Sequence, residues 1–404
     1  METPNTNQFI LGSKNQNQSP IPRVISIDIL RGVVMVLMTL DHVRFFFSNA
    51  DFNPLDLTQS NIPLFLTRWV THICAPTFIF LAGIGAYLSL KRGKSKPKLC
   101  RFLLLRGLWL VFLDLTVVTF SWSFNLRGNF FVAGVLWAIG WSMVFLAAVI
   151  YLPTRTIAAI GILMIVGHNF FDHVQAEQLG NIGWVWAILH ERKMLELTSG
   201  FRLFILYPLI PWIGVMAVGY AFGTLLEIEK NRRLQLLRKI SLSMIVTFII
   251  IRVINSYGDP NPWLIQSRFF YTLLSFINCH KYPPSLLYLL ITLGLAILLL
   301  YFLEKSEIRY FKPLIILGQQ PLFFYVIHFW LIHITAILFA LSRYGITPFT
   351  FSQLGISWKP KAFGYDLPIV YLIWLLMTVI LYIICERFAK YKKKHRGKWW
   401  LNYL

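Results

Sequence analysis

Residues 23–47 set the organisation of the chain, and they read RVISIDILRGVVMVLMTLDHVRFFF. As a helix that rises about 1.5 Å per residue, this stretch is long enough to cross a hydrocarbon core of about 30 Å. It nevertheless carries the ionisable residues Asp28, Arg31, Asp41 and His42. Each such group costs about 2.5–3.5 kcal/mol or more inside a membrane and usually faces a bundle interior or a water-filled cavity. We therefore expect a first membrane helix with a functional polar face.

The polar residues of this helix share one stripe. Arg31 and His42 are eleven residues apart, which at about 100° per residue puts them within about 20° of one another, and Asp28 lies about 40° from His42. Along the axis, Arg31 and His42 are separated by about 16 Å. The plainer alternative is a signal anchor whose Asp28 and Arg31 only pair at the membrane interface. That alternative does not explain Asp41 and His42, which lie too deep for snorkelling.

The composition indicates a polytopic, all-α membrane protein. The chain has 404 residues, of which 57% are hydrophobic and 16% aromatic, far above the apolar share of a soluble domain. Its net charge of +21 would suit a nucleic-acid partner, but most basic residues lie in short loops between apolar segments. We therefore expect the lipid bilayer, and no nucleic acid, as a partner. The four cysteines are scattered without a CxxC pair, so we predict no disulfide framework and no thiolate metal site.

Apolar segments of spanning length predict a bundle of about ten transmembrane helices. They lie at 24–47, 69–90, 103–121, 131–151, 155–171, 204–226, 240–257, 284–303, 314–341 and 367–388. We divide the chain into a polar tail (1–23), a transmembrane domain (24–390) and a basic tail (391–404). Roughly two thirds of the 38 lysines and arginines fall on one side of these segments, which predicts a multi-pass protein of the inner cell membrane with both termini in the cytoplasm.

Several histidines and a tyrosine are candidates for chemistry. His42 lies toward the outer end of the first predicted helix and His72 near the outer entrance of the second, so the two could be neighbours. In the ninth predicted helix, Tyr325 and His328 are three residues apart and share a face. A buried Tyr and His can equally satisfy one another's hydrogen bonds. His168 and His190 add polar groups on the same side, but the carboxylates and the spacing around these histidines give poor support for a metal site, and we expect no metal.

Arginines at the cytoplasmic side are candidates for a phosphate site. Arg101 and Arg106 open the third predicted helix beside the basic loop 91–98. Arg favours bidentate contacts with phosphate, so these residues and Arg31 could hold a nucleotide phosphate. The chain has no Walker-type loop, HExxH, GxSxG or dinucleotide fingerprint, which argues against the enzyme classes that depend on those motifs.

Four motifs together resemble one known superfamily. The first is Ser26-x-Asp28-x-x-Arg31-Gly32 followed by Asp41-His42, and the others are RWVTHICAP (68–76), LWAIGWS (136–142) and YPLIPWIG (207–214). The sequence over 23–390 is similar to the transmembrane acyltransferase superfamily, especially bacterial relatives of heparan-α-glucosaminide N-acetyltransferase. The O-acyltransferase branch has a histidine at the position of His42, and Gly318, Tyr325 and His328 keep the spacing of its late-helix motif, although Pro321 replaces a common serine. In the heparan branch an asparagine takes the place of His42.

The resemblance implies transfer of an acyl group, usually acetyl, from cytoplasmic acyl-CoA to an amino or hydroxyl group of an extracytoplasmic sugar or glycoconjugate. CoA would then lie by Arg31, Arg101 and Arg106, with Asp28 and Tyr325 in the same donor site. His42 would act as general base or transient acyl carrier. Asp41 would orient it or a neighbouring group, and His72 and His328 would complete the catalytic set.

Two other classes of function remain compatible with the same residues. A transporter or permease would use the polar stripe as a path for a solute or protons, and a membrane scaffold would tolerate substitution of His42. The sequence does not determine the acceptor, the choice between N- and O-transfer, or the length of the acyl chain. It also does not determine whether a covalent acyl-histidine forms or what the oligomeric state is.

Overall fold

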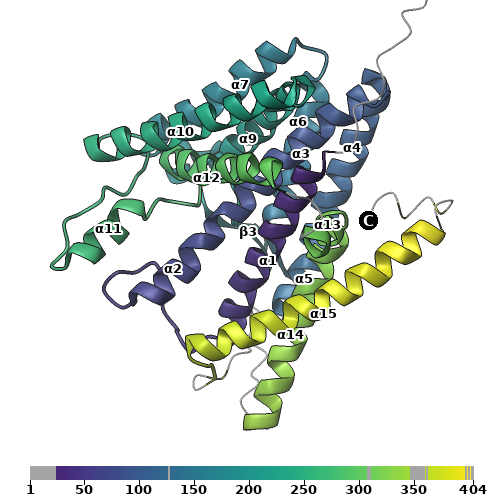
Figure 1. Ribbon diagram of the computed structural model, residues 1–404. Helices are drawn as coiled ribbons and strands as arrows, with labels where there is room; N and C mark the ends of the chain where they lie inside the picture. Colours follow the sequence, from purple (N-terminus) through teal and green to yellow (C-terminus); the bar gives the residue numbers. More distant parts are fainter. Residues whose placement is uncertain are drawn as a thin grey trace, which may run out of the picture.

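The computed structural model confirms an all-α polytopic bundle and describes residues 24–125, 128–306, 311–345, 360, 363–395, 398 and 401 (Figure 1). The predicted tail 1–23 lies outside these residues. The helices are α1 (Ile25–Phe47), α2 (Ile62–Val70), α3 (Cys74–Lys91), α4 (Lys96–Leu113), α5 (Thr119–Ser123), α6 (Val135–Val149), α7 (Thr154–Gly167), α8 (Gly183–Leu189), α9 (Leu209–Phe222), α10 (Lys230–Ile254), α11 (Phe269–Ile277), α12 (Leu286–Lys305), α13 (Lys312–Gly318), α14 (Pro321–Tyr344) and α15 (Leu367–Lys394).

Seven helical segments of the described chain are long and apolar enough to cross a membrane. They are Ile62–Lys91, Lys96–Ser123, Thr154–Phe171, Leu209–Glu227, Leu286–Lys305, Pro321–Tyr344 and Leu367–Lys394. The three other predicted spans are also helical, as α1, α6 and α10. α1 differs from the seven in its four charged side chains, α6 in its length of 15 residues and α10 in its basic first turns.

A small sheet replaces the first turns of two predicted helices. The strands are β1 (Phe130–Ala133), β2 (Lys193–Thr198) and β3 (Phe201–Ile205), in the order β1-β3-β2. β1 runs parallel to β3, with Phe130 opposite Arg202, and β2 runs antiparallel to β3. The predicted helix starts at 131 and 204 were therefore wrong, because a short apolar strand that leads directly into an apolar helix has no periodicity of its own. The sheet brings the starts of α6 and α9 together.

α1 lies at the centre of the bundle, against α3, α12, α13, α14 and α15 (Figure 1). Its closest approach is to α13. A Cβ added at Gly32 would lie 2.1 Å from the Leu314 carbonyl oxygen, and one added at Gly318 would lie 1.9 Å from the Asp28 carbonyl oxygen. Only glycine allows the two backbones to meet so closely.

The glycines of α3 have two different surroundings. A Cβ at Gly83 would lie 2.2 Å from the Met216 carbonyl oxygen of α9, whereas a Cβ at Gly85 would meet no atom within 4 Å. Gly85 instead lines a cavity. Of the two glycines, only Gly83 therefore lies in close contact with a neighbouring helix.

This difference predicts opposite effects of two matched substitutions. Gly83→Ala should destabilise the protein by about 1–3 kcal/mol, because the added methyl forces α3 and α9 apart. Gly85→Ala should be neutral or stabilising, since alanine has the higher helix propensity. Thermal unfolding of the two purified variants in the same detergent checks the prediction, and equal melting temperatures would contradict it.

Candidate functional site

Two cavities of the described chain lie beside α1. The first, the arginine cavity, has a volume of about 280 Å³ and contains Arg31 and Arg106 in its wall. The second, the histidine cavity, has a volume of about 430 Å³ and contains His42. Phe78, Val135 and Tyr325 line both cavities. The two spaces therefore share a wall in the middle of the bundle.

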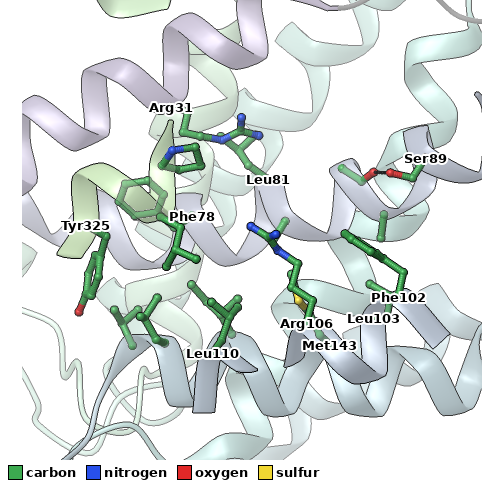
Figure 2. Close-up of a pocket in the computed structure, with 18 residues that line it drawn as sticks. Arg31, Phe78, Leu81, Ser89, Phe102, Leu103, Arg106, Leu110, Met143 and Tyr325 are labelled. Atoms are coloured by element: carbon green, nitrogen blue, oxygen red, sulfur yellow. Dashed lines mark hydrogen bonds between the residues drawn. The ribbon is translucent and has the colours of Figure 1, made fainter. Parts of the chain in front are cut away.

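The arginine cavity is largely apolar apart from its two guanidinium groups. Figure 2 shows Arg31 from α1 and Arg106 from α4 extending into the space, with Tyr325 at one end and Ser89 at the other. Arg31 Nη1 donates to the Gly318 carbonyl oxygen (3.0 Å) and pairs with Asp28 (3.4 Å). The close contact of α1 with α13 thus orients Arg31.

The three arginines predicted to bind phosphate are only partly brought together. Arg31 and Arg106 line the same cavity. Arg101 is exposed on α4 and lines neither cavity. Arg101 and Arg106 are five positions apart in the chain, so they point in directions about 140° apart on the helix.

His42 and His328 form a direct pair in the centre of the bundle. His42 Nδ1 lies 2.7 Å from His328 Nε2, and His328 Nδ1 lies 3.1 Å from the Phe324 carbonyl oxygen. A carbonyl oxygen only accepts, so we assign the proton of neutral His328 to Nδ1, which leaves its Nε2 to accept from His42 Nδ1–H. This tautomer leaves the lone pair of His42 Nε2 available as a base. The pair joins two residues 286 positions apart in the chain.

Asp41 forms ion pairs with two arginines, Arg44 and Arg68. Its Oδ1 accepts from Arg44 Nη2 (3.0 Å) and its Oδ2 accepts from Arg68 Nη1 (2.8 Å). Arg68 Nη1 also donates to Thr71 Oγ1 (3.1 Å). Asp41 thus contacts two neighbouring arginines, and its role in orienting groups of the site stays a prediction.

His72 lies in the packed interior of the protein. Its side chain is buried, and its carbonyl oxygen accepts from the hydroxyl of Tyr288 (2.7 Å). It lines neither of the two cavities. The structure therefore brings His42 together with His328 and leaves His72 in the surrounding packing.

Asp114 is a cavity residue that the sequence analysis missed. It begins a π-helical turn (Asp114–Val118) and its Oδ2 accepts from the backbone N–H groups of Gly134 (2.7 Å) and Trp137 (2.8 Å) at the start of α6. Its buried Oδ1 makes no hydrogen bond within the described part of the chain, and the residue lines the histidine cavity. A lone carboxylate inside the apolar segment 103–121 was the available signal.

The described wall of the histidine cavity carries more positive than negative groups. It contains Arg44, Arg68, Arg192 and Lys281 but only two carboxylates, Asp41 and Asp114. Arg192 and Lys281 come from connections, where no motif marks them. These positive charges also act on Tyr282, which lies in the same wall. Burial alone would raise the pKa of Tyr282, but the charges of Lys281 and Arg68 lower that pKa below its ordinary value. The cavity thus favours a negatively charged occupant.

The ion pairs of Asp41 predict a stability effect. Asp41→Asn should destabilise the protein by about 3–5 kcal/mol, because Arg44 and Arg68 would lose the charge that compensates their burial. Thermal unfolding measures the effect, with Glu196→Gln as a control, since that exposed carboxylate pairs with Arg202 at the surface. A melting temperature of Asp41→Asn equal to that of the control would show that the arginines do not depend on this carboxylate.

More than half of the chain matches a known protein family. A family model described as heparan-alpha-glucosaminide N-acetyltransferase, catalytic, matches residues 23–256. No curated protein matches the sequence. The matched range includes Arg31, His42 and Arg106, whereas Tyr325 and His328 follow it. The match confirms the resemblance seen in the sequence motifs.

Proposed function

The chain belongs to the family of heparan-alpha-glucosaminide N-acetyltransferase catalytic domains, and we propose that it transfers an acetyl group from acetyl-CoA across the membrane to a sugar. The family supports a membrane acetyltransferase-type activity. The donor, the side on which it binds and the catalytic residues are our proposal. The observation that supports it best is the pair of cavities that share Tyr325, with two arginines at one end and the His42–His328 pair at the other.

Acetyl-CoA fits the arginine cavity by its chemistry. The guanidinium groups of Arg31 and Arg106 suit its phosphates, and the apolar walls suit its extended arm. Arg31 and His42 are about 16 Å apart along α1. The thioester would therefore reach past Tyr325 to the histidine pair while the nucleotide stays near Arg106.

The cytoplasm is the proposed side of the donor. Ser89 and Phe102, which line the arginine cavity, flank the basic loop 91–98. Basic loops face the cytoplasm, where we place both termini as well. The histidine cavity would then open toward the other side, where the acceptor binds.

His42 Nε2 is the proposed base. It takes a proton from the amino or hydroxyl group of the acceptor as that group attacks the thioester carbonyl carbon. The new C–N or C–O bond forms, the C–S bond breaks, and the sulfur of CoA receives the proton from His42. His328 holds the ring of His42 in the reactive tautomer throughout, in the way that a third group orients the base of other acyl-transfer sites. In a route through acyl-imidazole, the same Nε2 attacks the thioester carbonyl carbon first, and the C–S bond breaks to release the CoA thiolate. The acceptor then attacks the acyl carbon, the C–N bond to Nε2 breaks, and the acceptor's proton passes through the freed Nε2 to the CoA sulfur.

The acceptor is proposed to carry an acidic group. Arg192 and Lys281 lie in the wall of the histidine cavity and stack on Tyr282, with Arg192 Cζ 5.5 Å and Lys281 Nζ 5.1 Å from its ring centre. Their charges favour a carboxylate or sulfate on the sugar. Asp114 Oδ1, which is free to accept a hydrogen bond, would select a donor group such as an amine or a hydroxyl.

His42→Ala should separate binding from chemistry. We expect acetyl-CoA binding close to that of the wild type and a release of CoA about 10²- to 10⁴-fold slower, because the base is lost. Equilibrium binding and CoA release by purified protein in nanodiscs measure both quantities. If the well-folded wild type binds no acetyl-CoA, the enzyme hypothesis fails and solute uptake becomes the assay for a transporter.

Two arginines of α4 provide a matched test of the donor site. Arg106→Ala should weaken acetyl-CoA binding, because this residue lines the arginine cavity, whereas Arg101→Ala should not, since that residue is exposed outside it. One charged hydrogen bond is worth about 1.5–3 kcal/mol, which corresponds to roughly 10- to 100-fold in dissociation constant. Equal weakening by both substitutions would indicate a general effect of surface charge.

Arg192→Gln tests the acceptor site. We expect a higher KM for an acidic sugar acceptor, an unchanged KM for a neutral one, and unchanged binding of acetyl-CoA. Kinetics with a sulfated and an unsulfated glucosamine oligosaccharide make the comparison. The same loss for both acceptors would show that Arg192 does not recognise the acidic group.

A further inference from the structure

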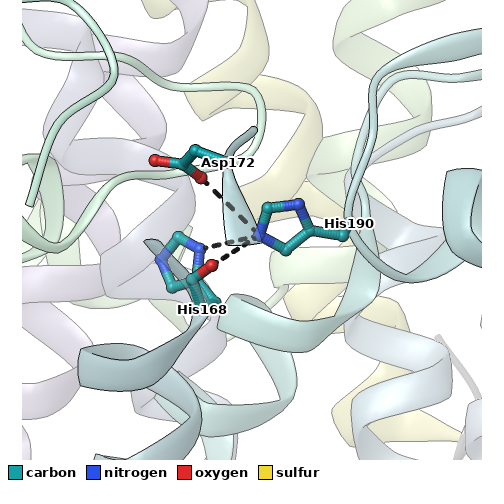
Figure 3. A group of neighbouring side chains, drawn as sticks. All are labelled: His168, Asp172 and His190. Carbon is teal, nitrogen blue, oxygen red and sulfur yellow. Dashed lines mark hydrogen bonds and ion pairs between the residues drawn. The ribbon is translucent and has the colours of Figure 1, made fainter. Parts of the chain in front are cut away.

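A second group of potential ligands lies outside both cavities. His168 directly follows α7, Asp172 lies four residues later, and His190 directly follows α8. One side-chain ligand atom from each residue lies within 4.8 Å of the other two (Figure 3). His168 and His190 are buried, and Asp172 is partly exposed. None of the three lines either cavity.

We propose that His168, Asp172 and His190 bind one divalent transition-metal ion, best matched by Zn²⁺. Two imidazole nitrogens and a carboxylate oxygen form a donor set typical of zinc. This inference does not depend on the proposed acetyltransferase activity. It departs from the sequence expectation of no metal, because the two histidines are 22 positions apart and no spacing motif marks them.

The distances between the donor atoms suit one shared ion. His168 Nδ1 lies 3.4 Å from His190 Nε2, which lies 3.7 Å from Asp172 Oδ1. Ligands about 2.0–2.1 Å from a tetrahedral Zn²⁺ lie about 3.4 Å from one another. The His168 carbonyl oxygen, 2.9 Å from His190 Nε2, is placed to supply a fourth ligand. An ion would draw these atoms together without a rearrangement of the backbone.

The surrounding residues hold the ligands in position. Asn169 Nδ2 donates to Asp172 Oδ2 (2.7 Å), and Asn169 Oδ1 accepts from the backbone N–H of Leu286 (2.9 Å). The ring of His190 stacks on Trp186, with 4.8 Å between ring centres. Such outer contacts orient metal ligands and typically change affinity by about 10- to 100-fold when removed.

The alternative is a hydrogen-bond network without an ion. In that case His190 Nε2–H donates to the His168 carbonyl oxygen, and the carboxylate of Asp172 adds an electrostatic contact. The two alternatives make different demands on His190 Nε2, which must carry a proton in the network and a lone pair in the metal site. Metal content distinguishes them.

The position of the site indicates a structural role. The ion would tie the end of α7 to the chain just before Arg192 and β2, and Arg192 lines the histidine cavity. With protein atoms in all four positions, no place is left for a reacting water, as in closed structural zinc sites. The metal would thus brace one wall of the histidine cavity.

Metal analysis of the full-length protein tests the proposal. The proteins are the wild type, His190→Ala, Asp172→Asn, and the control His173→Ala, which removes an exposed histidine of the same connection. After chelation, re-addition of Zn²⁺ and removal of unbound ion, we expect about one equivalent in the wild type and the control. We expect at least a tenfold weaker affinity in both site variants.

Thermal unfolding provides a second readout that does not need the site variants to fold. Zn²⁺ added to the chelated wild type and to His173→Ala should raise the melting temperature, because the ion binds only the folded state. Co²⁺ in place of Zn²⁺ should give the spectrum of a tetrahedral site. The proposal is overturned if the chelated wild type takes up no Zn²⁺. It is also overturned if the His173→Ala variant fails to bind Zn²⁺ while the His190→Ala variant binds it.

Discussion

The burial of charged and polar groups along α1 is the constraint on which the rest of the structure depends. Each of these groups requires a partner inside the bundle, and the partners come from distant parts of the chain. Arg31 donates to Gly318 of α13, Asp41 binds Arg68 of α2, and His42 pairs with His328 of α14. These contacts hold α1 at the centre and determine which side chains face the two cavities.

The same contacts connect the fold to the proposed chemistry. Close contact between α1 and α13 is possible because both carry glycine, and it orients Arg31 toward the arginine cavity. The hydrogen-bond chain from the Phe324 carbonyl through His328 leaves one nitrogen of His42 free. Packing thereby fixes the position of Arg31 relative to the His42–His328 pair, which are the proposed phosphate-binding and basic ends of the site. Such preorganisation is what an acyl-transfer site requires.

Much of the fold was predictable from the sequence because membrane helices are encoded by long apolar segments. The family, the all-α class and the polar stripe of α1 followed from that pattern and its motifs. The sheet β1-β3-β2 did not, since its strands merge with the apolar helices that follow. The pairing of His42 with His328 also could not be read from spacing, because it depends on how α1 and α14 pack.

The site was predictable where a residue breaks an apolar run, and unpredictable in the connections. Asp114 had such a signal and was missed, whereas Arg192 and Lys281 stand in loops whose path only the structure reveals. Arg101 and Arg106 looked equivalent in the sequence, yet the helix turns Arg101 away from the cavity. The direction in which a side chain points around its helix decides whether it lines a cavity. That direction can be interpreted only when the positions of the neighbouring helices are known.

Vectorial transfer in sealed proteoliposomes tests the central claim most directly. The protein is oriented in the vesicles so that the basic loop 91–98 faces the outside solution. Acetyl-CoA with a labelled acetyl group is added to that solution, and a glucosamine-terminated heparan oligosaccharide is enclosed inside the vesicles. We predict label on the enclosed sugar while the acetyl-CoA itself stays outside, because the two cavities share a wall within the bundle. Label only on sugar supplied on the same side as acetyl-CoA would contradict a site that spans the membrane.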